Sequence, residues 1–129
     1  RMSEILNDLS YSFDLLEELP AEKFIHTTTG NIISRSTVIR KPQALEVPGG
    51  KCVVQHECVI NADLAPIQLN RYVYIDKKCI LRPSNSVTDP SKFIPLTIGT
   101  GTFVGENTLI ESAVIGIGCE IGKNCVLSK

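Results

Sequence analysis

Residues 98–127 read IGTGTFVGENTLIESAVIGIGCEIGKNCVL, and this stretch decides the fold because one pattern recurs in it about every six residues. An aliphatic residue begins each unit, a glycine often follows it, and a small residue comes four places after it. The same spacing extends back to Val54, with steps of nine, seventeen and five residues as the exceptions. The aliphatic positions are Val54, Ile60, Leu69, Ile75, Leu81, Ile98, Val104, Ile110, Ile115, Ile121 and Leu127.

A repeat of six predicts short strands joined by corners, three to a coil of about eighteen residues, stacked into a triangular prism. Side chains alternate along a strand, so the aliphatic residue and the residue two places before it should point inward. We expect small side chains at the second position because the corner is narrow; the candidates are Cys58, Leu64, Val73, Cys79, Thr102, Thr108, Cys119 and Cys125. The residues after the aliphatic positions are expected to tolerate a positive φ at a corner; they are Gly99, Gly105, Gly116, Gly122, Asn70 and Asp76.

The in-phase repeat resembles the hexapeptide repeat of the left-handed parallel β-helix, and the left-handed winding is implied by this resemblance alone. The predicted class is therefore all-β. An antiparallel β-sandwich with strands of similar length is the alternative, but it predicts no glycine recurring in phase.

The predicted domain organisation is an N-terminal leader over 1–23 followed by the β-helix over 24–129. Apolar residues share one helical face within 3–19, which predicts a partly helical leader that either packs on its own prism or binds a partner. Residues 30–53 are expected to form a first, imperfect coil, with its aliphatic positions irregularly spaced at Ile32, Val38, Leu45 and Val53. Prolines interrupt the repeat at 82–97, which predicts a loop insertion. Since Leu127 falls midway through a coil, we expect either a further C-terminal segment or a partner's coil beyond it.

Composition excludes several classes of function. The 129 residues carry 13 basic and 14 acidic side chains, for a formal charge of −1, so there is no electrostatic drive toward nucleic acid or an anionic membrane. No apolar run approaches the roughly 20 residues of a membrane span. The five cysteines lack metal-ligand spacing, and four recur at the small position. They indicate reduced, buried thiols in a cytoplasmic protein.

The outward residues of each strand sort into three predicted columns. The most apolar column holds Val59, Ile80, Leu109 and Val126. A second column holds Val53, Tyr74, Phe103 and Glu120, and a third, more polar column holds Gln68, Thr97 and Val114. Because soluble monomers seldom expose a large apolar patch, we expect the N-terminal helix or a partner subunit to cover the first column. The loop residues Lys92, Phe93 and Ile94 are further candidate partner contacts, with packing on the prism as the alternative.

The sequence predicts no catalytic residue, cofactor or metal. Hexapeptide-repeat acyltransferases use a histidine as general base, and His56 is the candidate here, but as a lone surface histidine it favours an inert role. The segment 61–67 resembles the Arg-Gly-Asp-x-x-Pro-Ile stretch of γ-class carbonic anhydrases, with Asn61 and Ala62 in place of Arg and Gly. Those enzymes need three histidine ligands for zinc, and this chain has two histidines. Both enzyme classes remain as alternatives to a non-catalytic protein.

A closer resemblance begins at FIHTTTGNIISR, residues 24–35, which is similar to the opening of the dynactin subunit 5 family. Further matches lie at 58–60, 63–65, 81–83, 95–99 and 122–126. The resemblance implies a non-catalytic scaffold subunit of the dynactin pointed-end complex, cytoplasmic and associated with the cytoskeleton. It also implies a β-helical partner like dynactin subunit 6, other pointed-end subunits, and cargo adaptors for dynein-driven transport.

Overall fold

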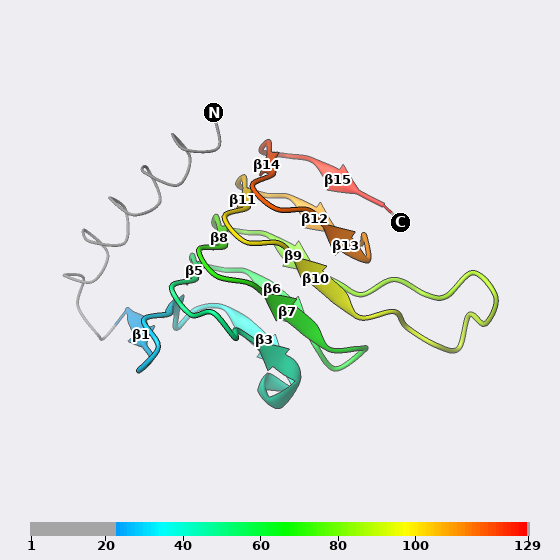
Figure 1. The fold of residues 1–129 in the computed structure, drawn as a ribbon, viewed down its shortest axis with the longest axis horizontal. Helices are drawn as coiled ribbons and strands as arrows, with labels where there is room; N and C mark the ends of the chain where they lie inside the picture. Colours follow the sequence, from blue (N-terminus) through cyan, green and yellow to red (C-terminus); the bar gives the residue numbers. More distant parts are fainter. Residues whose placement is uncertain (1–22, 129) are drawn as a thin grey trace.

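The computed structural model describes residues 23–128, and its strands form three sheets wound around one interior (Figure 1). The first sheet contains β1 (Phe24–His26), β2 (Ile32–Ser34), β5 (Val53–Val54), β8 (Tyr74–Ile75), β11 (Phe103–Val104) and β14 (Glu120–Ile121). The second contains β3 (Val38–Arg40), β6 (Val59–Asn61), β9 (Ile80–Leu81), β12 (Leu109–Ile110) and β15 (Val126–Leu127). The third contains β4 (Leu45–Glu46), β7 (Ile67–Leu69), β10 (Leu96–Ile98) and β13 (Val114–Ile115). A short 3₁₀ helix, η1 (Pro42–Ala44), precedes β4.

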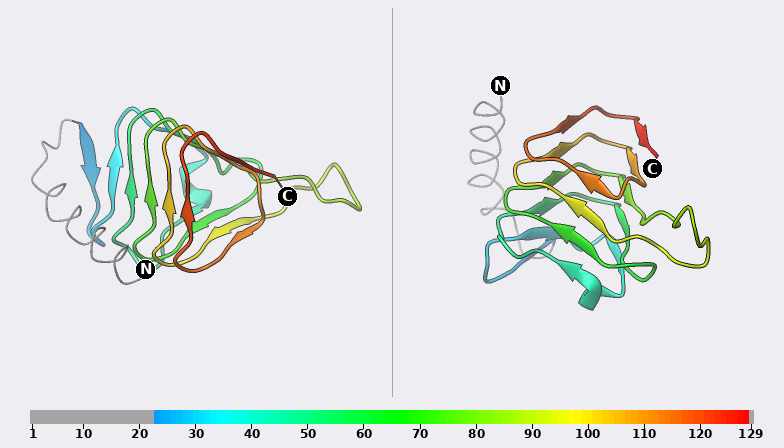
Figure 2. Two further views of the ribbon diagram at one scale, coloured as in Figure 1. Left: turned by 90° about the horizontal axis from the view of Figure 1, so that it is seen from above. Right: turned by 45° about the vertical axis from the view of Figure 1, so that its right-hand side comes forward.

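From β2 onward, consecutive strands lie in different sheets and each strand pairs in parallel with the strand one coil away, which is the topology of a parallel β-helix. Figure 2 shows the coils one behind another around the shared interior. The all-β coil predicted from the repeat is thus confirmed, and the antiparallel sandwich is wrong. Among the strands of the described residues, only β1 runs antiparallel, and it pairs with β2 at the start of the first sheet.

The aliphatic repeat positions form the core, as predicted. All eleven belong to or pack against one apolar cluster, and those from Val54 to Ile110 are fully buried. Burying a Val, Leu or Ile side chain contributes roughly 1.5–3 kcal/mol, so this cluster is the main source of stability. Because the side chains come from all three sheets, the core holds the three faces of the prism together.

The residues whose side chains point inward differ from the prediction in two places. In the first coil Ile33 and Ile39 point inward, in register with Val54 and Ile60. In the nine-residue step Ile67, and not Leu64, takes the inward position before Leu69, and it is fully buried. Where two aliphatic residues are adjacent, as at Ile32 and Ile33, the alternation of side chains along a strand does not show which of them points inward. In the nine-residue step, the extra residues shift the inward position from Leu64 to Ile67.

None of the four repeated glycines has a positive φ, and two of them, Gly99 and Gly105, allow close packing of one coil on the next. Positive φ falls instead on the residue just before the small inward position, as at Lys78, with φ 60°, and Asn107, with φ 59°. A Cβ atom built on Gly99 would lie 2.6 Å from the backbone carbonyl of Gly116 in the next coil. The positive φ predicted at these positions was therefore wrong. At Gly99 and Gly105 the backbone of the next coil occupies the space of a side chain, whereas a Cβ atom on Gly116 or Gly122 would meet only a cysteine sulfur at 3.6 or 3.5 Å.

Hydrogen-bond donors at the small positions join one coil to the next. The Thr108 hydroxyl donates to the Gly122 carbonyl at 2.8 Å, and the Cys79 thiol donates to the Gly105 carbonyl at 3.0 Å. Thr37, Cys58, Cys52 and Thr102 donate in the same way to the carbonyl of the following corner. Cysteine and threonine therefore share one requirement, a small side chain that carries a donor. Cys52 meets it too, although the sequence pattern had assigned only four cysteines.

The loop insertion occupies residues 82–95, between β9 and β10, and projects away from the prism (Figure 1). Its arms approach each other through an antiparallel bridge between Asn85 and Phe93. The predicted helical leader within 3–19 lies outside the described residues. Among residues 23–128 no helix is long and apolar enough to cross a membrane.

Candidate functional site

The outer face of the second sheet carries an unbroken apolar column. Val59, Ile80, Leu109 and Val126 are direct register partners on β6, β9, β12 and β15, so the predicted column exists. Val38 on β3 extends it by one coil, because Val38 pairs with Val59. Sequence reasoning missed Val38 since the phase of the first coil was misassigned. Val38 is 51% exposed, Ile80 39% and Val126 63%, while Val59 and Leu109 are half-buried.

A polar column runs beside the apolar one. Arg40 is the register partner of Asn61, and Arg82 directly follows Leu81, the partner of Ile60. The strand period of two places these side chains on the same outward face as Val59 and Ile80. Glu111 continues the column on the next coil, where its backbone N–H donates to the Leu127 carbonyl at 2.7 Å.

The two columns meet in a groove of about 430 Å³ on this face. Its lining combines side chains of the apolar column with side chains of the polar column, and Asp63 and Leu64 contribute from the loop between β6 and β7. The lining residues are Arg40, Val59, Asn61, Asp63, Leu64, Ile80, Arg82 and Leu109. Apolar side chains flanked by charged ones suit a protein segment better than a small polar metabolite.

The loop residues predicted as partner contacts do not line this groove. The Ile94 N–H donates to the Ser84 carbonyl at 2.8 Å, and the Ser86 N–H donates to the Lys92 carbonyl at 2.8 Å. These bonds and the bridge at Phe93 hold the two arms of the loop together, with Phe93 and Ile94 half-buried near its base. The most exposed apolar side chain of the loop is Val87, at 85%, which sequence reasoning did not single out.

The first sheet presents a different outer face, which is aromatic and partly covered. Tyr74 and Phe103 stack with ring centroids 5.2 Å apart, and Gln55 Nε2 donates to the Tyr74 hydroxyl at 2.7 Å. Val53 is fully buried in a cluster with Phe24 and Ile32. The predicted column of Val53, Tyr74, Phe103 and Glu120 is in register. The third predicted column, Gln68, Thr97 and Val114, is in register as well.

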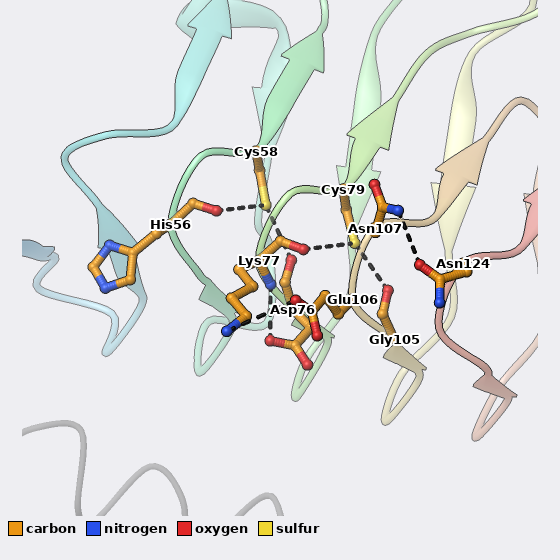
Figure 3. A network of polar contacts seen from close by, with 9 residues as sticks. All are labelled: His56, Cys58, Asp76, Lys77, Cys79, Gly105, Glu106, Asn107 and Asn124. Carbon is orange, nitrogen blue, oxygen red and sulfur yellow. Dashed lines mark hydrogen bonds and ion pairs between the residues drawn. The ribbon is translucent and has the colours of Figure 1, made fainter.

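The cysteines are structural donors inside the coils. Figure 3 shows the Cys58 thiol directed at the Asp76 carbonyl and the Cys79 thiol at the Gly105 carbonyl. Burial raises the pKa of the Cys52 thiol to about 11, against a lowering by the Val73 backbone. A hydrogen bond with Cys58 and burial raise the pKa of Cys79. These two thiols stay protonated at neutral pH and are poor nucleophiles.

Between residues 23 and 128, no cluster of ionisable groups forms a reactive centre around either histidine. His56 Nδ1 lies 2.7 Å from the Ser34 hydroxyl, and its ring packs on Phe24 with centroids 4.9 Å apart. His26 lies on β1 and is exposed. Within residues 23–128 no group of three or more His, Cys, Asp or Glu side chains is placed to hold a metal ion. The contacts of His56 with Ser34 and Phe24 account for the position of its ring, and they favour neither enzyme alternative.

One comparison identifies the family. A family model described as dynactin subunit 5 matches residues 14–129, nearly the whole chain. Such subunits are generally non-catalytic and structural, and a dynactin subunit associates with other dynactin subunits and with the cytoplasmic cytoskeleton. On this match the chain belongs to the dynactin subunit 5 family.

Proposed function

We propose that this chain is a non-catalytic scaffold of the dynactin pointed-end complex, wound as a left-handed β-helix. Its partners would be a β-helical subunit like dynactin subunit 6, other pointed-end subunits, and cargo adaptors for dynein-driven transport. Family membership supports the assembly, and a stiff prism with an exposed apolar column supports the scaffold role. The column of Val38, Val59, Ile80, Leu109 and Val126 is the single observation that carries the proposal, because such a surface gains free energy when a partner covers it.

The column is tested with Leu109→Lys in the full chain. A lysine in the middle of the column places a charge where an apolar contact is expected, so co-purification with the other dynactin subunits should fall by about tenfold or more. Thr97→Lys is the matched control, because Thr97 occupies the middle of the more polar third face. Circular dichroism confirms that both variants fold. Unchanged recovery of dynactin subunits with Leu109→Lys would overturn the role of the column.

The loop contacts are tested separately with the double change Phe93→Ser and Ile94→Ser. Partner recruitment should weaken while the coil stays folded, because the loop projects from the prism and is held mainly by its own backbone bonds. Val87→Ser at the loop tip shows whether the tip or the base carries the contact. Undiminished recruitment by all three changes would mean that the loop only packs on itself.

A further inference from the structure

The distance between the two arginines beside the apolar column is set by the pairing of the strands that carry them. Arg40 and Arg82 lie two coils apart, with Asn61 between them, on strands β3, β6 and β9. Neighbouring strands in a sheet are about 4.8 Å apart, so the two arginines project from points roughly 10 Å apart along the prism. Their separation is therefore fixed by the hydrogen-bonded sheet and not by a flexible loop.

Neither arginine is neutralised within the part of the chain that the structure describes. No salt bridge joins Arg40 or Arg82 to a residue between 23 and 128, whereas Lys77 pairs with Glu106 at 3.7 Å on another corner. Asp63 lines the same groove and Glu111 lies next to Arg82 in the polar column, but neither carboxylate forms an ion pair with either arginine. Two guanidinium groups at the rim of an apolar groove favour an anionic partner, and guanidinium geometry suits carboxylates.

The backbone N–H and C=O groups of the strands on this face are already hydrogen-bonded to neighbouring strands. Strands β6, β9 and β12 each have a hydrogen-bonded strand on both sides, so a partner cannot bind here by adding a strand. Contact must be made through side chains. An α-helix presents apolar side chains along one stripe, one turn of about 5.4 Å apart, close to the spacing of the column. Residues seven apart on a helix lie about 10.5 Å apart on one face, which matches the separation of the arginines.

We propose that the groove binds a helical segment of another protein that runs along the prism axis. Its apolar stripe lies on Val59, Ile80 and Leu109, and two carboxylates about seven residues apart bind Arg40 and Arg82. This inference rests on the proposed function, since it describes the partner that the assembly surface accepts. The charges fix the orientation and register of the helix, and the apolar stripe supplies most of the affinity.

The test uses three synthetic helical peptides of about 21 residues, a length of about 30 Å. Each carries a leucine stripe, and the two edge positions seven residues apart are Glu, Gln or Lys. Binding to the full 129-residue chain is measured by fluorescence anisotropy at low and high salt. The Glu peptide should bind about tenfold more tightly than the Gln peptide, and this advantage should shrink at high salt.

Charge reversal gives the decisive comparison. The double variant Arg40→Glu and Arg82→Glu should lose about tenfold in affinity for the Glu peptide and should prefer the Lys peptide instead. The matched control is Lys78→Glu with Lys123→Glu, which changes the net charge equally at exposed corners outside the groove. Glu57 already occupies the equivalent of Lys78 one coil earlier, also with a positive φ, so the control is compatible with the fold.

Several results would overturn the inference. One is equal binding of the three peptides, and another is an equal loss of affinity in the control variant. Concentration-dependent dimerisation that Leu109→Lys abolishes would assign the face to a second copy of the chain. Peptide binding that appears only after residues 1–22 are deleted would assign it to the chain's own N-terminal segment. If the peptides fail while the chain still co-purifies with dynactin subunits, this inference is wrong and the proposed function stands.

Discussion

The substitution Gly105→Ala tests how much the close contact between two successive coils contributes to stability. A Cβ atom at residue 105 would lie 2.6 Å from the Lys123 nitrogen and 2.7 Å from the Gly122 carbonyl carbon, both backbone atoms of the following coil. Ordinary contact needs about 3.4 Å, so the two coils must separate locally by about 0.8 Å. The Gly105 N–H to Ile121 carbonyl bond and the Asn124 N–H to Glu106 carbonyl bond, each 2.8 Å long, would stretch beyond hydrogen-bonding range.

The expected cost follows from these two bonds. Each contributes about 0.5–1.5 kcal/mol, so their loss amounts to roughly 1–3 kcal/mol. Alanine also restricts the unfolded chain, which offsets about 0.4–1 kcal/mol. The free energy of unfolding should therefore fall by about 1–2 kcal/mol, close to the usual cost of an overpacked site.

Gly122→Ala is the matched control. Gly122 holds the same repeat position one coil later, because Val104 pairs with Ile121. There a Cβ atom would meet only the Cys125 sulfur at 3.5 Å, and φ is not positive, so alanine should stabilise by about 0.4–1 kcal/mol. Urea unfolding followed by circular dichroism measures both variants. Equal unfolding free energies would refute the close-packing explanation, because the two sites differ mainly in what lies above them.

Three further predictions concern the interior. Thr108→Val removes the donor to the Gly122 carbonyl and should cost about 0.5–1.5 kcal/mol in urea unfolding, while Thr108→Cys should retain most of it; equal losses would contradict the shared donor role. Because burial raises the Cys52 pKa from 9.0 to about 11, the protonated thiol stabilises the fold below about pH 9. That contribution should be lost as pH rises through 11, with Cys52→Val as a variant that lacks it. Val104→Asp buries an unpaired charge and should abolish cooperative unfolding seen by circular dichroism, whereas Glu106→Gln at an exposed corner should not.

The periodicity determined the sheets because it carries redundant information. Eleven aliphatic positions, spaced mostly by six, allow one register only, and from that register the outward columns follow without coordinates. Where that redundancy ends, prediction failed: two neighbouring aliphatic residues at Ile32 and Ile33 fit either phase, and only the pairing with Val54 selects Ile33 as the inward one.

Contacts between coils could not be predicted from the sequence. The need for glycine at position 105 arises from the backbone of residues 122 and 123, seventeen and eighteen positions away, and no local pattern records that contact. The charged edge of the groove was missed for a related reason. Arg40 and Arg82 are far apart in the chain and become neighbours of one surface only when Asn61 is placed between them.

The stacking of coils also fixes the distances between side chains on one face of the prism. Because β6, β9 and β12 are each hydrogen-bonded to both neighbouring strands, two groups at equivalent strand positions lie a whole number of strand spacings apart along the prism axis. Gain or loss of one complete coil would move one arginine relative to the other by a full step while leaving every core contact type intact. Changes in the number of coils can therefore alter which partners are recognised without any change in the residues that recognise them.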